Sequence, residues 1–288
     1  MVVEGFMSGL HRSPYQGFSV EFTDYRQYSP GDDLRYLDWK LYARADRHYI
    51  KRFEDETNLN SYLLFDVSRS MNFGSIGYTK TQYAQTLAAT LAYFFSLQRD
   101  ATGLLSFDEK IVSFIPPRYR PGHLRRLMIG LEATGSGRTT DVALPIEELA
   151  RTVSKRGMVV LISDLLAPVE LFADSLGLLR ARGHDVMVLR ILDPQDVSFD
   201  FDDAAMFHDL ETGKEFYVDP QSAAAEYRKR FDQHRAAIKK RCEDLGVDFS
   251  ECITDEPLEN ALFKVIQSRA QRGPQSARQA ARSTGGSA

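Results

Sequence analysis

The stretch NSYLLFDVSRSM, residues 60–71, decides the fold of this chain. Its apolar run YLLF predicts a buried strand, and Asp66, Ser68 and Ser70 follow where that strand ends. Three short oxygen-bearing side chains, two positions apart, can converge on one hard cation. Mg²⁺ prefers near-octahedral oxygen ligands, keeps several waters and needs few carboxylates. The stretch therefore predicts a strand that ends in part of a metal site, with one coordination position left for a partner.

Two further segments can complete this site. Thr139 and Thr140 follow a glycine-rich turn, and Asp164 ends a second apolar run at 158–163. In open parallel sheets, ligands lie beyond the carboxyl ends of strands, where the strand order reverses. If the strand that ends in Asp66 is central, these segments meet there.

Length and composition are those of an ordinary soluble protein. The 288 residues are 43% hydrophobic and 26% charged, which is enough for one large α/β domain with an extension. The net charge of −4 gives no global basic field, so we expect no nucleic-acid partner. No apolar run approaches the roughly 18 residues that cross a bilayer. We expect a cytoplasmic protein without a membrane span, in which Cys242 and Cys252 are reduced thiols.

Strands and helices alternate along most of the chain. Apolar runs predict strands at 61–66, 101–107, 111–115, 158–163, 185–191 and 247–252, with weaker ones at 18–22, 48–53, 205–208 and 215–218. Helical patterns occupy about 79–98, 122–132, 142–154, 169–181, 221–245 and 258–268. This alternation predicts an α/β fold with a mainly parallel sheet flanked by helices.

Composition divides the chain into three parts. Residues 1–58 are polar, aromatic and rich in turn signals, and we expect a small β-rich extension in which Trp39 anchors a core. Residues 59–268 form the α/β domain. Residues 269–288 are small and polar without a carboxylate side chain, so we expect a disordered tail.

The N-terminal stretch GFSVEFTDYRQYSPGDDLRYLDWKLYARADRHYIKRFEDE carries a specific set of motifs. Its Glu-Phe-x-x-x-Arg-x-Tyr, Pro-Gly-Asp-Asp-x-Arg, Asp-Trp and Ala-Arg elements resemble the bacterial domain of unknown function 58 family. Members of that family carry a von Willebrand factor A-like, Rossmann-like domain directly after this signature. The resemblance implies an adaptor or chaperone-like role beside a MoxR-type AAA+ ATPase or another von Willebrand factor A protein.

The order Asp-x-Ser-x-Ser, then Thr, then Asp resembles the metal-ion-dependent adhesion site of von Willebrand factor A domains. The resemblance implies that Mg²⁺ or Mn²⁺ is bound by Asp66, Ser68, Ser70, Thr140 and Asp164. Thr140 is preferred to Thr139 because the family's threonine is typically followed by Asn or Asp. A carboxylate of a protein partner would complete the metal shell, with no catalytic residue involved.

Several alternatives remain at this point. Asp66 and the two serines can cap the following helix, which would leave a scaffold with an empty site. The same cluster can serve a metal-dependent hydrolase, although no general base is evident. A haloacid-dehalogenase-like phosphohydrolase needs a second carboxylate where Ser68 stands. The run 135–139 lacks the lysine and the preceding strand of a phosphate-binding loop, and the basic residues of 221–245 interleave with acids as on a solvated helix.

Overall fold

The computed structural model describes most of the chain, in two units. The described residues are 20–29, 37–45, 48–55, 60–132, 141–153, 156–201, 203–209 and 213–263. One unit comprises the described residues within 12–58, and the other comprises those from residue 60 onward. Each unit is considered by itself.

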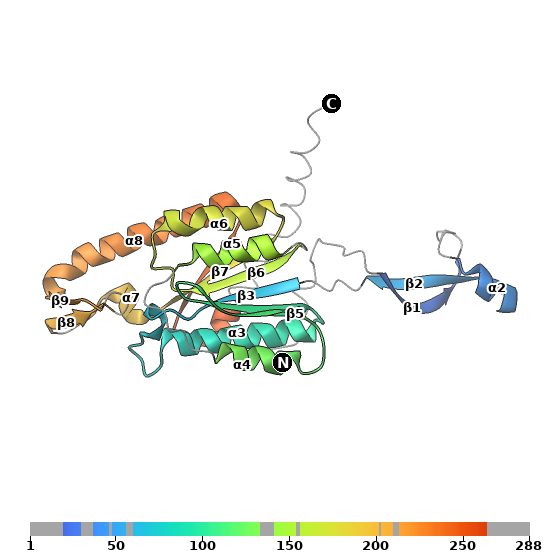
Figure 1. Ribbon diagram of the computed structural model, residues 1–288, viewed down its shortest axis with the longest axis horizontal. Coiled ribbons are helices and arrows are strands. Elements are labelled where there is room, and N and C mark those ends of the chain that lie inside the picture. Colours follow the sequence, from blue (N-terminus) through green and yellow to red (C-terminus); the bar gives the residue numbers. More distant parts are fainter. Residues whose placement is uncertain are drawn as a thin grey trace, which may run out of the picture. The chain divides into compact units, whose positions relative to one another are not determined.

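The larger unit is built on a six-stranded sheet with the order β10-β7-β6-β3-β4-β5 (Figure 1). Its strands are β3 (Asn60–Asp66), β4 (Ala101–Phe107), β5 (Ile111–Arg118), β6 (Gly157–Ser163), β7 (Asp185–Leu192) and β10 (Asp248–Ile253). Only β5 runs antiparallel, paired with β4, and the other five strands are parallel. The predicted mainly parallel α/β sheet is confirmed.

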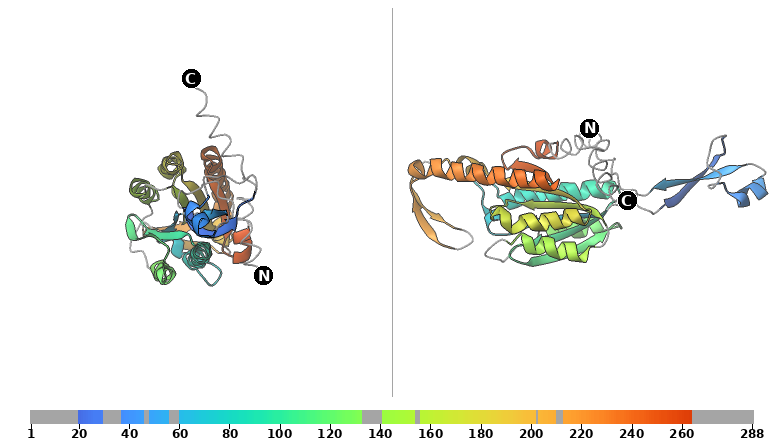
Figure 2. Two further views of the ribbon diagram at one scale, coloured as in Figure 1. Left: turned by 90° about the vertical axis from the view of Figure 1, so that its right-hand side faces the viewer. Right: turned by 90° about the horizontal axis from the view of Figure 1, so that it is seen from above.

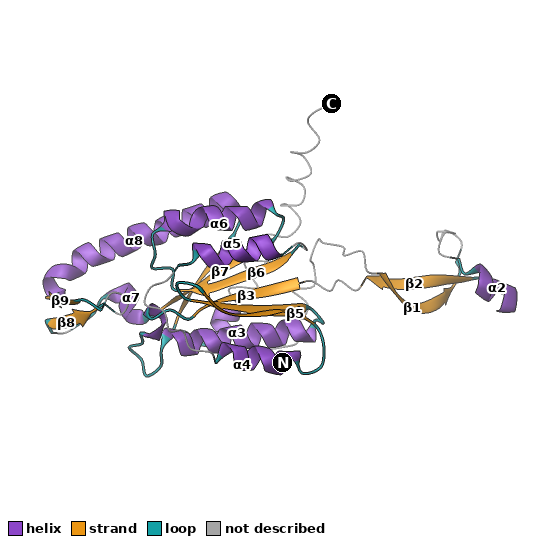
Figure 3. Cartoon of the chain, viewed as in Figure 1, coloured by secondary structure: helices purple, strands orange, loops and turns teal. Residues whose placement is uncertain are grey.

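Helices cover both faces of this sheet (Figures 2 and 3). They are α3 (Lys80–Leu97), α4 (His123–Leu131), α5 (Ala143–Thr152), α6 (Val169–Ala181), α7 (Pro194–Ser198) and α8 (Pro220–Leu245), with a 3-10 turn η2 (Ser70–Asn72). Helices α3 and α4 lie on one face, and α5, α6 and α8 lie on the other (Figure 1). A short antiparallel ribbon of β8 (Ala205–His208) and β9 (Glu215–Val218) precedes α8.

The apolar run of β3 is buried on both faces, as a central parallel strand requires. Leu63 and Phe65 pack toward α3 and α4, whereas Tyr62 and Leu64 pack toward α5 and α6. Because alternate side chains point to opposite faces, a strand covered on both faces is apolar at every position. This explains why the sequence showed a continuous apolar run instead of an alternation.

The strand order reverses at β3. From β3 the chain passes through α3 to β4 and β5 on one side, and then returns through β6 on the other side of β3. The carboxyl ends of β3 and β6 therefore flank a topological switch point, where open α/β sheets bind their ligands. Asp66 ends β3, and Asp164 directly follows β6.

The smaller unit contains β1 (Val20–Gln27), α2 (Trp39–Ala45) and β2 (Tyr49–Asp55). The two strands pair antiparallel with an irregularity between Phe22 and Asp24, so the expected β-rich extension is present. Strand β1 ends later than the predicted 18–22, and the first two residues of that prediction lie outside the described part of the chain. The prediction that Trp39 anchors a core is wrong, because this side chain is 64% exposed at the first position of α2.

Some predictions lie outside the described residues. The tail 269–288 and part of 1–58 are among them, and the last predicted helix is described only for Leu258 to Phe263. The proposed limits of the three parts of the chain therefore stay predictions. Within the described ranges, no helix has both the length and the apolar character needed to cross a bilayer.

Candidate functional site

Asp66 lies at the carboxyl end of β3 with its side chain fully buried. Its Oδ1 accepts a 2.9 Å hydrogen bond from the backbone N–H of Ser68, and its Oδ2 accepts a 2.5 Å bond from Ser163 Oγ. The first contact is the Asx turn expected where a strand gives way to a loop. The second comes from the last residue of the neighbouring β6. Both contacts fix the orientation of the carboxylate.

Ser68 and Ser70 present their hydroxyls to the same point. The two Oγ atoms lie 3.1 Å apart, and both residues are buried, Ser68 in the loop and Ser70 at the start of η2. A separation near 3 Å is what two oxygens in one octahedral shell of radius about 2.1 Å have. The spacing in Asp-x-Ser-x-Ser therefore brings the two hydroxyl oxygens together.

Asp164 lies one residue beyond β6 and is held by two cationic side chains. Its Oδ2 accepts a 2.8 Å bond from Lys80 Nζ, and its backbone oxygen accepts a 3.0 Å bond from Arg190 Nε. Lys80 Nζ also lies 3.0 Å from Asp196 Oδ2 in α7. All but Asp196 are almost fully buried. The structure thus brings Asp66, Ser68, Ser70 and Asp164 to one end of the sheet.

The two buried carboxylates of the site differ in how well a nearby positive charge compensates them. Burial, and then the negative charge of Asp164, raise the pKa of Asp66 to about 7. Burial alone would lower the pKa of Lys80, but Asp164 and Asp196 together raise it above its usual value. Among the described residues at this end of the sheet, Lys80 forms ion pairs with Asp164 and with Asp196 but not with Asp66. A further positive charge beside Asp66 would therefore be stabilised.

The donor set suits a hard divalent cation. Asp66 and Asp164 offer carboxylate oxygens, and Ser68 and Ser70 offer hydroxyl oxygens. No three His, Cys, Asp or Glu side chains form a metal-binding group in the part of the chain that the structure describes. A cation here would consequently depend on two carboxylates, serine hydroxyls and water. Thr140, the fifth predicted ligand, lies outside the described residues, although Asp141 beside it is described.

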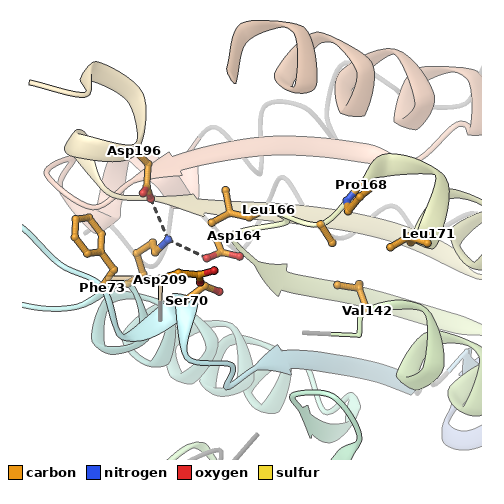
Figure 4. A pocket seen from close by; sticks show the side chains of 11 residues that line it. Ser70, Phe73, Val142, Asp164, Leu166, Pro168, Leu171, Asp196 and Asp209 are labelled. Carbon is orange, nitrogen blue, oxygen red and sulfur yellow. Dashed lines mark hydrogen bonds and ion pairs between the residues drawn. The ribbon is translucent and has the colours of Figure 1, made fainter. Parts of the chain in front are cut away.

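A cavity of about 480 Å³ opens beside Ser70 and Asp164 (Figure 4). One part of its wall is polar, with Ser70, Lys80 and Asp164. The other part is apolar and includes Leu166 and Leu171, which are 46% and 63% exposed. The loop after β6 and the start of α6 supply this apolar wall (Figure 4). The cavity can therefore receive a group that is charged at one end and apolar at the other.

Sequence reasoning missed the cationic partners of the site. Lys80 and Arg190 lie within a helix pattern and a strand pattern, where a single basic residue attracts no notice. One signal was present. Lys80 is the first residue of α3, and a cation is unfavourable at a helix N-terminus unless a carboxylate compensates it.

Arg190 joins three elements behind Asp164. It is fully buried in β7, lies 3.4 Å from Glu251 of β10 and 3.3 Å from His234 Nδ1 of α8, and stacks over Phe231. Glu251 also accepts a 2.6 Å bond from Arg235 Nε. This network fixes the backbone at Asp164 through its carbonyl oxygen.

Comparison with known sequences identifies the family. The profile described as "Protein of unknown function DUF58" matches residues 24–241, most of the chain. This chain belongs to the DUF58 family. An uncharacterized protein of Mycobacterium tuberculosis is 27% identical to this DUF58 protein over 272 residues, which span 93% of the chain and 85% of the relative. An uncharacterized protein of Mycobacterium avium is 33% identical over 141 residues, 48% of the chain and 81% of the relative.

A solved structure shares the fold of this DUF58 protein. An aerotolerance-related membrane protein from Bacteroides fragilis, crystallised with multiple mutations to serines, superposes with a TM-score of 0.53. The alignment covers 74% of this chain and 99% of that chain at 14% sequence identity. At this identity the likeness concerns the arrangement of strands and helices and carries no statement about ligands.

Proposed function

We propose that this DUF58 protein is a divalent-metal-dependent protein-binding module. The site would work like the metal-ion-dependent adhesion site of von Willebrand factor A domains, with Mg²⁺ or Mn²⁺ held by Asp66, Ser68, Ser70, Thr140 and Asp164. The observation that carries the proposal is the 3.1 Å approach of the Ser68 and Ser70 hydroxyls beside the buried Asp66, at the switch point of the sheet.

The charges of the site support a cation there. Asp66 and Asp164 are both buried and repel one another, which contributes to the raised pKa of Asp66. A bound divalent ion would supply the positive charge that these two carboxylates lack. Ser70 and Asp164, which line the cavity, would hold the ion on the side that a partner can reach.

The cavity indicates the chemistry of the partner. A partner carboxylate is a hard oxygen donor and neutralises the remaining positive charge of the ion. Next to it, Leu166 and Leu171 offer exposed apolar surface to an apolar side chain of the same partner segment. The family resemblance points to a MoxR-type AAA+ ATPase, or another von Willebrand factor A protein, as the source of that segment.

Calorimetric titration with Mg²⁺ and Mn²⁺ tests the proposal. We expect saturable binding to the wild-type protein and its loss in Asp66→Ala. The matched control is Asp174→Ala, because Asp174 is an aspartate on the surface of α6 with a side chain that is 90% exposed. Equal binding by wild type and Asp66→Ala would overturn the proposed site.

The second step is binding of the MoxR-type ATPase with and without EDTA. We expect the complex to form with the metal-loaded protein and to dissociate in the chelator. An affinity that is the same in EDTA and in Mg²⁺ would exclude the metal-dependent mechanism even if the metal site itself is real.

A further inference from the structure

Lys80 is an unusual residue at the centre of this site. Its side chain is 1% exposed, and its ammonium lies 2.8 Å from Asp164 Oδ2 and 3.0 Å from Asp196 Oδ2. Asp164 belongs to the proposed metal set, whereas Asp196 does not. The ammonium therefore joins a residue of the proposed metal set to a carboxylate outside that set, and the two contacts end at Asp164 and Asp196 in Figure 4.

Helix α3 does not need Lys80 for its own stability. Thr79 and Gln82 already form a capping box at its N-terminus. A positive charge at the first helical position opposes the helix dipole, and burying a lysine is unfavourable without compensation. The residue is therefore explained by the carboxylates that it contacts and not by the helix that carries it.

The side chain of Asp196 is held in position by hydrogen bonds of its own helix, α7. Its Oδ2 accepts a 3.0 Å bond from the backbone N–H of Asp193, which completes the capping box of α7. The hydroxyl and backbone N–H of Ser75 in turn bind the carboxylate of Asp193. Asp196 thus offers Lys80 a fixed partner that does not depend on Asp164.

We propose that Lys80 is a built-in cation that competes with a divalent metal ion for Asp164 and so sets the metal affinity of the site. The inference rests on the proposed metal function and adds to it the residue that tunes binding. When a metal ion binds Asp164, the ammonium group of Lys80 keeps its contact with Asp196. The site would then be filled only when the ion, or the ion together with a partner carboxylate, outcompetes the lysine.

The competition follows from charge and geometry. An ammonium 2.8 Å from Asp164 Oδ2 already uses part of the acceptor capacity of a carboxylate that would hold the metal ion. It also places a positive charge close to the incoming ion, in a buried setting where screening by solvent is weak. A purely structural ion pair would instead leave metal affinity unchanged when the lysine is replaced.

Mg²⁺ titration of wild type, Lys80→Met and Asp196→Asn tests the inference. Lys80→Met removes the competitor, so Mg²⁺ should bind about tenfold tighter or more. Asp196→Asn keeps the shape of the side chain but removes the alternative partner of Lys80, so Mg²⁺ should bind more weakly than to wild type. The two variants thus shift affinity in opposite directions, which a general loss of folding cannot do.

A second readout is thermal unfolding with and without Mg²⁺. Without metal, Lys80→Met should unfold at a lower temperature than wild type, and saturating Mg²⁺ should raise its Tm more than that of wild type. If Lys80→Met does not fold without metal, the weaker binding of Asp196→Asn decides the question. Unchanged or weaker affinity in Lys80→Met, or unchanged affinity in Asp196→Asn, would overturn the role of Lys80.

The outcomes for Lys80 and for the metal site are separable. Binding by wild type with equal binding by Lys80→Met would refute the competition and leave the metal site standing. Binding by Lys80→Met alone would support the competition while removing metal dependence from the wild-type function. Absence of binding in all three proteins would refute both.

Discussion

Ser163 Oγ lies 2.5 Å from Asp66 Oδ2, so the last residue of β6 donates a hydrogen bond to the last residue of β3. The same hydroxyl oxygen accepts a 3.1 Å bond from the backbone N–H of Leu165. Ser163 therefore fixes both the carboxylate and the turn that carries Asp164. The hydroxyl group of Ser163 thus joins the two halves of the proposed site, in addition to the backbone pairing of β3 with β6.

Replacement of Ser163 by alanine should destabilise the protein by about 1–3 kcal/mol, because Asp66 Oδ2 would be left buried without a donor. Urea unfolding measures the loss. The control Ser222→Ala removes an exposed hydroxyl near the start of α8 and should change stability by less than about 0.5 kcal/mol. Equal stability of wild type and Ser163→Ala would show that this contact is not important for the fold.

Glycine at position 157 is required by the close approach of two strands. A Cβ there would lie 2.2 Å from the backbone oxygen of Asn60, the residue paired with it in β3. Gly157→Ala should therefore cost about 1–3 kcal/mol through overpacking. Chemical denaturation tests this. The metal affinity should not change, because these residues begin the strands whose opposite ends carry the site.

Gly177, within α6, provides the contrasting case. A Cβ at this position would lie 3.4 Å from Leu245 Cδ2, an ordinary contact with a side chain. Because alanine favours helix over glycine by about 1 kcal/mol, Gly177→Ala should be neutral or stabilising by up to that amount. A large loss of stability in Gly177→Ala would contradict this account of helix packing.

The contribution of His234 to stability should be lost on acidification, because the folded protein holds this side chain neutral. Burial, with the nearby charge of Arg190, lowers its pKa below the ordinary value, although Glu170 and a bond to the Ala167 oxygen act in the opposite direction. The unfolded chain therefore takes up a proton first as pH falls below about 6.5. The stabilising contribution is complete above that pH and is lost below it.

Unfolding curves between pH 8 and pH 5 measure this effect, with His234→Gln as the comparison. Glutamine can donate to the Ala167 oxygen and accept from Arg190 without titrating, so the stability of wild type relative to His234→Gln should fall as pH falls through this range. His184, whose pKa burial also lowers, and Asp66, whose raised pKa acts in the opposite direction, contribute to both curves and cancel in their difference. A difference in stability between the two proteins that stays constant from pH 8 to pH 5 would show that His234 does not cause the effect.

The apolar wall of the cavity should contribute to partner affinity alone. Leu171→Ser should weaken binding of the metal-dependent partner by about tenfold, since burying a leucine contributes about 1.5–3 kcal/mol. Mg²⁺ affinity should be unchanged. The control is Leu178→Ser on the same helix, where the side chain is 38% exposed and does not line the cavity. Equal weakening by both variants would place the partner on another surface of α6.

The central sheet could be predicted well from the sequence because a strand that is buried on both faces is a continuous apolar run. The run YLLF before Asp66 and the run MVVLIS before Asp164 both became central strands with these carboxylates at their ends. Since parallel strands share one carboxyl edge, the convergence of Asp66 and Asp164 followed from strand direction alone. The hydroxyl approach of Ser68 and Ser70 followed from their spacing.

The parts that were missed depend on contacts distant in sequence or on elements too short to show periodicity. The pairing of Lys80 with Asp164 joins residues 84 positions apart and has no local pattern. Helix α7 has five residues, fewer than two turns, so its local signals were limited to the capping box around Asp193 and the proline at its first position. Trp39 was expected to anchor a core, but its position on a short helix leaves most of it in solvent.

The strand order has a consequence for the synthesis of this protein. β3 emerges from the ribosome before β4, β5 and β6, yet its carboxyl end is complete only when β6 pairs along its second edge. A nascent chain that stops short of Ser163 holds Asp66 beside an unpaired strand edge, without the hydroxyl that orients it. The proposed site is therefore incomplete until translation has passed the middle of the chain.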